Sequence, residues 1–157
     1  MQRNPTDLGN GDKYEGELNN RLKHGYGTYT WAYGDSYTGD WVNDKQHGHG
    51  VYQFANGSRY EGEFSEGEFN GEGTLRNVAQ EDDDIVEYLG EWKASLPHGK
   101  GRALYRNGDR YEGSFDRGER SGVGNYEFNR YFRYEGEWKD NCFHGYGKLF
   151  RNNELFF

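Results

Sequence analysis

Residues 134–138 read Tyr-Glu-Gly-Glu-Trp, and variants of this stretch occur six times in the chain. Each copy has a glycine two residues after its tyrosine and a large apolar residue four residues after it. The tyrosines are separated by 23, 23, 28, 23 and 23 residues. They are Tyr14, Tyr37, Tyr60, Tyr88, Tyr111 and Tyr134. A period this regular indicates an array of repeats, which decides the fold before any other feature.

A second motif begins ten residues after each tyrosine. It reads His-Gly-x-Gly in four copies, and Asn70 or Ser121 replaces the histidine in the other two. Both motifs alternate with a period of two, which is typical of β-strands. Turn-forming dipeptides such as Asn56-Gly57 and Asn107-Gly108 precede the next tyrosine. Each repeat is therefore predicted to be a β-hairpin that a tight turn joins to the next hairpin.

Six consecutive hairpins predict an all-β fold, an elongated, twisted, single-layer antiparallel sheet of about twelve strands. The array should cover residues 10–157, and residues 1–9 form either a loose lead-in or the remnant of a capping strand. The third repeat is longer than the others, so we expect a bulging acidic insertion at about 76–86, around Glu81–Asp84. Phe157 occupies the tyrosine position of a seventh repeat. The chain therefore ends either in a closing strand or within a longer protein.

Composition restricts the classes of protein and partner. Hydrophobic residues make up only 32% of the 157 residues, and aromatic residues alone make up 18%. A repeat array tolerates this shortage of aliphatic side chains, because each unit needs only to bury its contacts with its neighbours. The net charge of −8 disfavours binding to nucleic acid or to anionic membranes. The single cysteine and the lack of a long apolar run favour a soluble cytoplasmic protein.

The tyrosine, the glycine and the apolar residue of each copy share one face of the sheet. These rings should form the core of the sheet, while their edges stay open as a groove for a protein partner. The expected groove residues are Tyr37, Trp41, Tyr60, Phe64, Tyr88, Trp92, Tyr111, Phe115, Tyr134 and Trp138.

The residues one and three positions after each tyrosine point to the opposite face. Acidic residues dominate there: Glu15, Glu17, Asp40, Glu61, Glu63, Glu91, Glu112, Glu135 and Glu137. One interpretation is a solvated face that keeps the sheet soluble and blocks stacking. The alternative is an acidic track that attracts a basic partner. Either way, this face should repel anionic lipid.

The sequence gives little support for metal binding or catalysis. His24, His47, His98 and His144 occupy one repeat position, so neighbouring copies should lie about 9–10 Å apart. That spacing is too long for one zinc ion, whose ligands lie about 2 Å away. The Gly-x-Gly pairs match no phosphate-binding loop, and the carboxylates lie in rows rather than in a pocket. We therefore predict no metal, no cofactor and no catalytic residue.

The two motifs in fixed register resemble the MORN repeat family over residues 10–157. The resemblance implies a solenoid-like sheet of hairpins and a scaffold role at cytoskeletal, ciliary or membrane-contact structures. Some members of the family pair through their array ends, and others hold a partner segment in a groove. An early interpretation of the repeat was that it binds lipid. Where an enzyme of the family carries such an array, catalysis lies in another domain.

Together these features predict a non-catalytic protein–protein interaction scaffold. Its expected partner is a protein segment, for example a basic amphipathic helix or strand, and homodimers through an array end are a further expectation. Two alternatives stay open. One is a phospholipid-binding adaptor, although the charge opposes it, and the other is the regulatory region of a larger enzyme.

Overall fold

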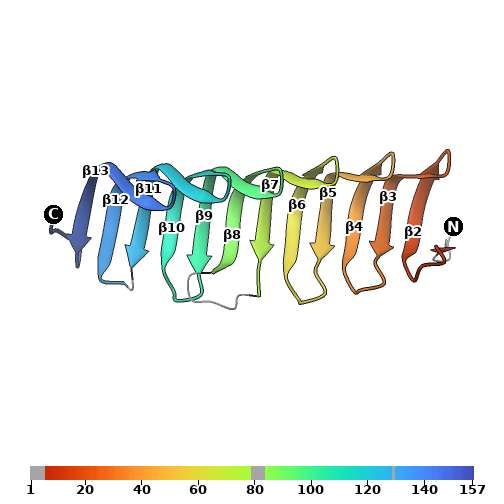
Figure 1. Cartoon of the computed structure of the whole chain (residues 1–157), viewed down its shortest axis with the longest axis horizontal. Coiled ribbons are helices and arrows are strands. Elements are labelled where there is room, and N and C mark those ends of the chain that lie inside the picture. Colours follow the sequence, from red (N-terminus) through yellow and green to blue (C-terminus); the bar gives the residue numbers. More distant parts are fainter. Residues whose placement is uncertain (1–5, 79–83, 129) are drawn as a thin grey trace.

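The computed structural model describes residues 6–78, 84–128 and 130–157, which form one elongated sheet (Figure 1). Its fourteen strands follow one another in sequence order, and each pairs antiparallel with its neighbours. Six hairpins form the repeats: β2 (Lys13–Asn19) with β3 (Leu22–Thr30), β4 (Ser36–Val42) with β5 (Lys45–Gln53), β6 (Arg59–Ser65) with β7 (Glu68–Arg76), β8 (Ile85–Lys93) with β9 (Leu96–Tyr105), β10 (Arg110–Asp116) with β11 (Glu119–Phe128), and β12 (Phe132–Lys139) with β13 (Cys142–Arg151). The predicted all-β sheet of consecutive hairpins is confirmed.

Two short strands raise the number above the expected twelve. They are β1 (Thr6–Asp7), which pairs with β2, and β14 (Glu154–Leu155), which pairs with β13. Each satisfies part of an edge that would otherwise present unpaired backbone groups. Of the predicted acidic insertion, residues 79–83 lie outside the described residues. Within the described part of the chain, no helix is long and apolar enough to cross a membrane.

A row of twelve glycines crosses the sheet from β2 to β13. Strand pairing places Gly16 opposite Gly27, Gly27 opposite Gly39, and so on without a break to Gly147. The ring of each repeat tyrosine lies over this row. A side chain at Gly73 would overlap the ring of Tyr60, and the same holds in the other repeats. The glycines are therefore needed to let the rings lie on the backbone.

The repeat tyrosines and the five aromatic residues at the last position of the Tyr-x-Gly-x-apolar motif form one unbroken chain of contacts, the aromatic ladder. Each ring meets the next edge to face, with centroids 4.9–5.8 Å apart and planes at 77–90°. In order along the sheet the ladder is Tyr14, Trp41, Tyr37, Phe64, Tyr60, Trp92, Tyr88, Phe115, Tyr111, Trp138 and Tyr134. The ladder couples each repeat to the next, as expected for a one-dimensional array.

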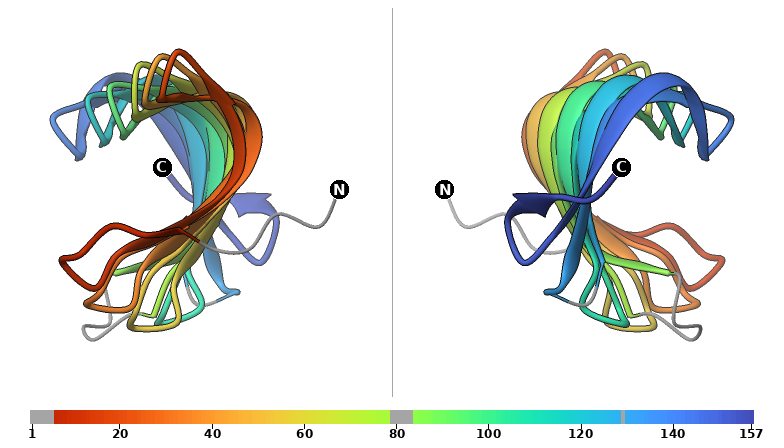
Figure 2. Two further views of the ribbon diagram at one scale, coloured as in Figure 1. Left: turned by 90° about the vertical axis from the view of Figure 1, so that its right-hand side faces the viewer. Right: turned by 90° about the vertical axis from the view of Figure 1, so that its left-hand side faces the viewer.

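A single layer buries these rings because its strands curve. Seen end-on, both the hairpin loops and the turns bend to the same side, so the sheet is a trough (Figure 2). Tyr37, Tyr60 and Tyr88 are fully buried, which requires the curved strands to enclose them. We therefore place the aromatic face on the inside of the trough and the acidic columns on the outside.

The polar atoms of the ladder are also satisfied. All six repeat tyrosines donate a hydrogen bond from the hydroxyl to the carbonyl three residues on, at 2.7–2.9 Å. The indole N–H groups of Trp41, Trp92 and Trp138 donate to glycine carbonyls in the preceding repeat, at 3.0–3.1 Å. Rings with a polar tip can thus form the core of this sheet with these hydroxyl and indole groups hydrogen-bonded.

Alkaline pH should unfold the array. Burial raises the pKa of Tyr29 and Tyr111 to about 12, and it raises the pKa of Tyr37, Tyr60 and Tyr88 as well. Unfolded tyrosine ionises near pH ~10, so the folded state favours the protonated ring. The stabilisation should be complete below pH ~10 and should be lost as the pH rises towards the folded pKa values. The tyrosinate absorbance of the buried tyrosines should appear together with the loss of circular dichroism; ionisation of these buried tyrosines near pH ~10 within an intact sheet would contradict this.

Candidate functional site

The ten residues predicted to line a groove all lie in the core. Their exposed fractions run from 0% for Tyr37 to 7% for Tyr134. Each ring is enclosed by its neighbours in the ladder, so these rings form the core as expected, but their edges are covered rather than open. A direct partner contact would therefore have to use other side chains of the aromatic face. Whether the ten rings contribute to partner binding stays a prediction.

A second set of rings on the aromatic face is only partly buried. We call these residues of repeats 1–3 the aromatic strip: Trp31, Tyr33, Tyr52, Phe54 and Phe69. Their centroids follow one another at 6.4, 5.5, 4.7 and 6.4 Å from Tyr33 through Trp31, Tyr52 and Phe54 to Phe69. Tyr33 is 67% exposed, and the other four rings are partly exposed. The alternating runs after the His-Gly-x-Gly motif were the signal for Trp31, Tyr33, Tyr52 and Phe54, whereas Phe69 precedes that motif in its repeat.

In repeats 4 and 5 two of the corresponding rings are covered, whereas Phe128 is partly exposed. Tyr105 and Tyr126 are buried, and the guanidinium of Arg120 lies 5.5 and 5.1 Å from their ring centroids. Arg120 also donates a hydrogen bond to the Tyr105 hydroxyl at 2.7 Å and lies 5.0 Å from the Trp138 ring. The equivalent positions in repeats 2 and 3 are Gln46 and Phe69. The aromatic face is thus more open over the first three repeats.

Five of the nine predicted acidic-face residues form a hydrogen bond with the backbone. The carboxylate three residues after the tyrosine accepts a hydrogen bond from a backbone N–H nine residues later, at 2.5–3.0 Å. These acids are Glu17, Asp40, Glu63, Glu91 and Glu137. The bond crosses the point where the hairpin register shifts after the row glycine. Part of the acidic pattern therefore stabilises the β-bulge of each hairpin.

Three other predicted acids pair with arginine on the same face. Arg59 contacts Glu61 at 3.0 Å, Arg102 contacts Glu112 at 3.4 Å, and Arg133 contacts Glu135 at 2.9 Å. These pairs are partly exposed, so each stabilises the fold little. They do, however, neutralise much of the charge that an acidic track would need. The proposed attraction of a basic partner to this face stays untested.

The fifth repeat offers a test of the bulge carboxylate, because Ser114 takes its place. Ser114→Glu should raise the free energy of unfolding by about 0.5–1 kcal/mol, the value of one exposed, charge-assisted hydrogen bond. Urea denaturation provides the measurement. Ser114→Gln is the matched control. It should raise the free energy of unfolding by less, because the amide oxygen of glutamine carries no charge. Equal stability of the glutamate variant and the original chain would contradict the assigned role.

The sequence analysis missed a set of turn aspartates. Two residues before the tyrosine, Asp12 and Asp35 each accept a hydrogen bond at 2.5 Å from the hydroxyl of Tyr29 and Tyr52, respectively. Asp109 accepts one from the Tyr126 hydroxyl at 2.8 Å. The Tyr29 hydroxyl holds the pKa of the Asp12 carboxyl below its usual range. The recurrence of aspartate at this position was the signal, and its effect is to fix the turn against the next strand.

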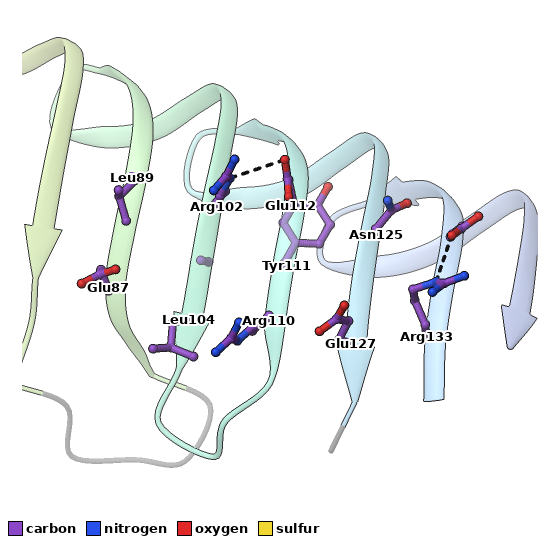
Figure 3. A pocket seen from close by; sticks show the side chains of 12 residues that line it. Glu87, Leu89, Arg102, Leu104, Arg110, Tyr111, Glu112, Asn125, Glu127 and Arg133 are labelled. Carbon is purple, nitrogen blue, oxygen red and sulfur yellow. Dashed lines mark ion pairs between the residues drawn. The ribbon is translucent and has the colours of Figure 1, made fainter. Parts of the chain in front are cut away.

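A shallow depression crosses the outer face over β8–β12, with a volume of about 560 Å³ (Figure 3). Glu87, Leu104, Arg110, Glu127 and Arg133 stand in one row across it, and strand pairing places each beside the next. Acidic and basic groups both occur along this row, so the electrostatic potential over the depression is neither uniformly positive nor uniformly negative. This arrangement gives no preference for a ligand of one charge.

The histidines do not converge. Among the residues that the structure describes, no group of three or more potential ligands is placed to hold a metal ion. The Nδ1 atoms of His24 and His47 are buried, and His98 lies 3.4 Å from Asp116. These side chains lie in the first, second and fourth hairpins and so belong to separate repeats. They do not form one site.

Comparison with protein families agrees with this geometry. The family model described as MORN repeat matches six segments, namely residues 14–36, 37–59, 60–77, 88–110, 111–130 and 134–154. The segments begin at the six tyrosines of the ladder, and together they cover most of the chain. MORN repeats are non-catalytic modules that generally serve in binding. The chain belongs to the MORN repeat family.

Proposed function

We propose that this chain is a non-catalytic protein–protein interaction scaffold that holds a partner segment on its aromatic face. The observation that carries the proposal is the aromatic strip, where adjacent rings remain partly exposed beside a ladder that is buried. Contiguous exposed apolar surface often marks an interaction site, and Tyr, Trp and Phe are enriched at protein interfaces. The row of repeats also suits an extended partner, because each repeat presents equivalent positions at a regular spacing.

The cellular setting belongs to the same proposal. The chain would act in the cytoplasm, as part of a cytoskeletal, ciliary or membrane-contact assembly. A second contact surface would lie at β13, where Phe143 is 51% exposed and Tyr146 is 90% exposed. Pairing of two copies there would give a homodimer. Light scattering over a wide concentration range tests this, and a strict monomer at high concentration would contradict it.

Affinity capture from native lysate, followed by mass spectrometry, tests the scaffold function. The bait is the whole chain, compared with a double variant in which Trp31 and Phe54 are serine. A partner held on the aromatic face should be recovered with the original chain and depleted with the double variant. Val123→Ser, which changes an exposed residue of the outer face, should retain it. Recovery of the same proteins with all three baits would contradict binding on this face.

Membrane binding is the main alternative, and we expect it to fail. The net charge of −8 repels anionic lipid. In flotation assays at physiological salt, the chain should stay with the soluble fraction in the presence of vesicles containing phosphatidylserine or phosphoinositides. Neutral vesicles serve as the control. Flotation that depends on anionic lipid would favour a phospholipid-binding adaptor instead. The remaining alternative, a regulatory region of a larger enzyme, is decided by the full reading frame.

A further inference from the structure

We infer that the segment bound by this scaffold is basic and amphipathic, and that it lies across repeats 1–3 with its apolar side on the aromatic strip. The inference rests on the proposed function and adds to it the location and the chemistry of the partner. Two independent features of the molecule lead to it, namely the open rings of the first three repeats and the unequal distribution of charge along the array.

The apolar side of the partner would contact rings that no other part of the described chain covers completely. Trp31 and Phe54 occupy the same repeat position, and Tyr52 lies between them at 5.5 and 4.7 Å. Phe69 extends the row into the third repeat. From β3 to β7 there are four strand spacings, or about 19 Å. A helix of about 13 residues has that length, so a short amphipathic helix spans the strip.

The charge of the array is concentrated in the same half. Residues 6–78 contain twelve Asp and Glu but only six Lys and Arg, whereas residues 84–157 contain twelve of each. The first half is therefore strongly acidic and the second is neutral. The hairpin loops of the first half include Glu68, which is exposed, and Glu66, which is exposed and pairs with Lys45 at 2.9 Å. Such a field attracts a basic segment and accelerates its association.

The second half is unsuited to the same partner. Arg120 lies over Tyr105, Tyr126 and Trp138, so it fills the place where an apolar side chain would rest. Its positive charge would also repel a lysine or an arginine of the partner. In the first half, Lys23 holds the equivalent position and lies 5.3–5.9 Å from the rings of Tyr14, Tyr29 and Trp41. Its charge is paired with Asp44 at 2.9 Å, and the aromatic strip begins beyond it. A basic segment thus has both an apolar platform and a favourable field only over repeats 1–3.

Designed peptides test the inference with the whole chain. The probe is a helix-forming peptide of about 18 residues with leucine on one face and lysine on the other. A second peptide has glutamate in place of every lysine. Each carries one photo-crosslinking residue on its apolar face. Calorimetry at low and physiological salt measures the affinity, and mass spectrometry of the crosslinked chain maps the contact.

Three protein variants accompany the probes. The Trp31→Ser/Phe54→Ser double variant removes two rings of the strip, and Tyr33→Ser removes an exposed ring with little effect on the fold. Phe128→Ser is the matched control, because Phe128 holds the same repeat position in the second half. Thermal melts of all variants confirm that each is folded. Where the double variant melts early, Tyr33→Ser decides the outcome.

The lysine peptide should crosslink to residues 6–78 and bind at least about tenfold more tightly than the glutamate peptide. Its affinity should fall about tenfold in the double variant, fall measurably in Tyr33→Ser, and stay unchanged in Phe128→Ser. Equal binding of the two peptides, or crosslinks confined to residues 84–157, would overturn the inference and leave the scaffold function in place. Failure of both peptides to bind would also overturn it, whereas lysate capture decides the scaffold function separately.

Discussion

Replacing Gly101 by alanine should lower the free energy of unfolding by about 3–5 kcal/mol, among the largest effects expected for a single methyl group. Gly101 lies in the glycine row, and a Cβ there would overlap the ring of Tyr88. The ring cannot move aside, because Trp92 and Phe115 meet it edge to face at 5.0 and 5.1 Å. The substitution must therefore expel a fully buried tyrosine or separate two strands.

The backbone at Gly101 does not require glycine for its own conformation, so the expected loss is steric. Gly108→Ala is the matched control for conformational strain. Gly108 has a φ of +92°, and a Cβ there meets nothing within 4 Å. Its replacement should cost only about 1–2 kcal/mol. Urea denaturation followed by circular dichroism compares the two, and equal losses would contradict the role assigned to the glycine row.

Sequence periodicity predicted which residues share a face, but it did not predict how they pack. The spacing of Tyr37 and Trp41 places both rings inward, and the structure confirms this. The contact of Trp41 with Tyr14 of the preceding repeat depends on the curvature of the strands, which a motif does not encode locally. Leu18 shows the consequence. It holds the same motif position as Trp41, yet it is 57% exposed because no earlier repeat tyrosine packs on it.

The outer face shows a second limit of prediction from sequence periodicity. Glu63 and Glu61 are identical in type and both point outward, so alternation assigns them the same solvated role. The structure separates them: Glu63 accepts the backbone N–H of Glu72 at 2.5 Å, whereas Glu61 pairs with Arg59. The difference arises from the register shift after Gly62, which brings one carboxylate to an amide. Simple two-residue alternation does not predict a β-bulge, so it cannot assign these roles.

Replacing Trp92 should cause the second large loss of stability, because Trp92 joins the third repeat to the fourth. Its ring meets Tyr60 and Phe69 of the third repeat at 5.3 and 5.6 Å, and Tyr88 of its own repeat at 5.0 Å. Its indole N–H donates to the carbonyl of Gly73 at 3.1 Å. Trp92→Ala should remove all of these contacts and cost about 3–5 kcal/mol.

The loss should also change the cooperativity of unfolding. In a one-dimensional array, contacts between neighbouring repeats make the units unfold together. Without the Trp92 ring, repeats 1–3 and repeats 4–6 should unfold in two separate transitions. Residue-resolved hydrogen exchange during urea denaturation measures this, because amides of residues 6–78 and 84–157 should then lose protection at different urea concentrations.

The chain supplies its own control for this experiment. Phe64 and Phe115 occupy the position of Trp92 in other repeats, and they lie 4.9 and 5.1 Å from the tyrosine of the preceding repeat. Trp92→Phe should therefore preserve a single transition and cost only about 1–2 kcal/mol, for the lost hydrogen bond and the smaller ring. A single transition in the alanine variant would show that strand pairing alone couples the two halves. Because Trp92 is buried, loss of partner binding in the alanine variant would report the broken array, and only the exposed strip residues report the contact itself.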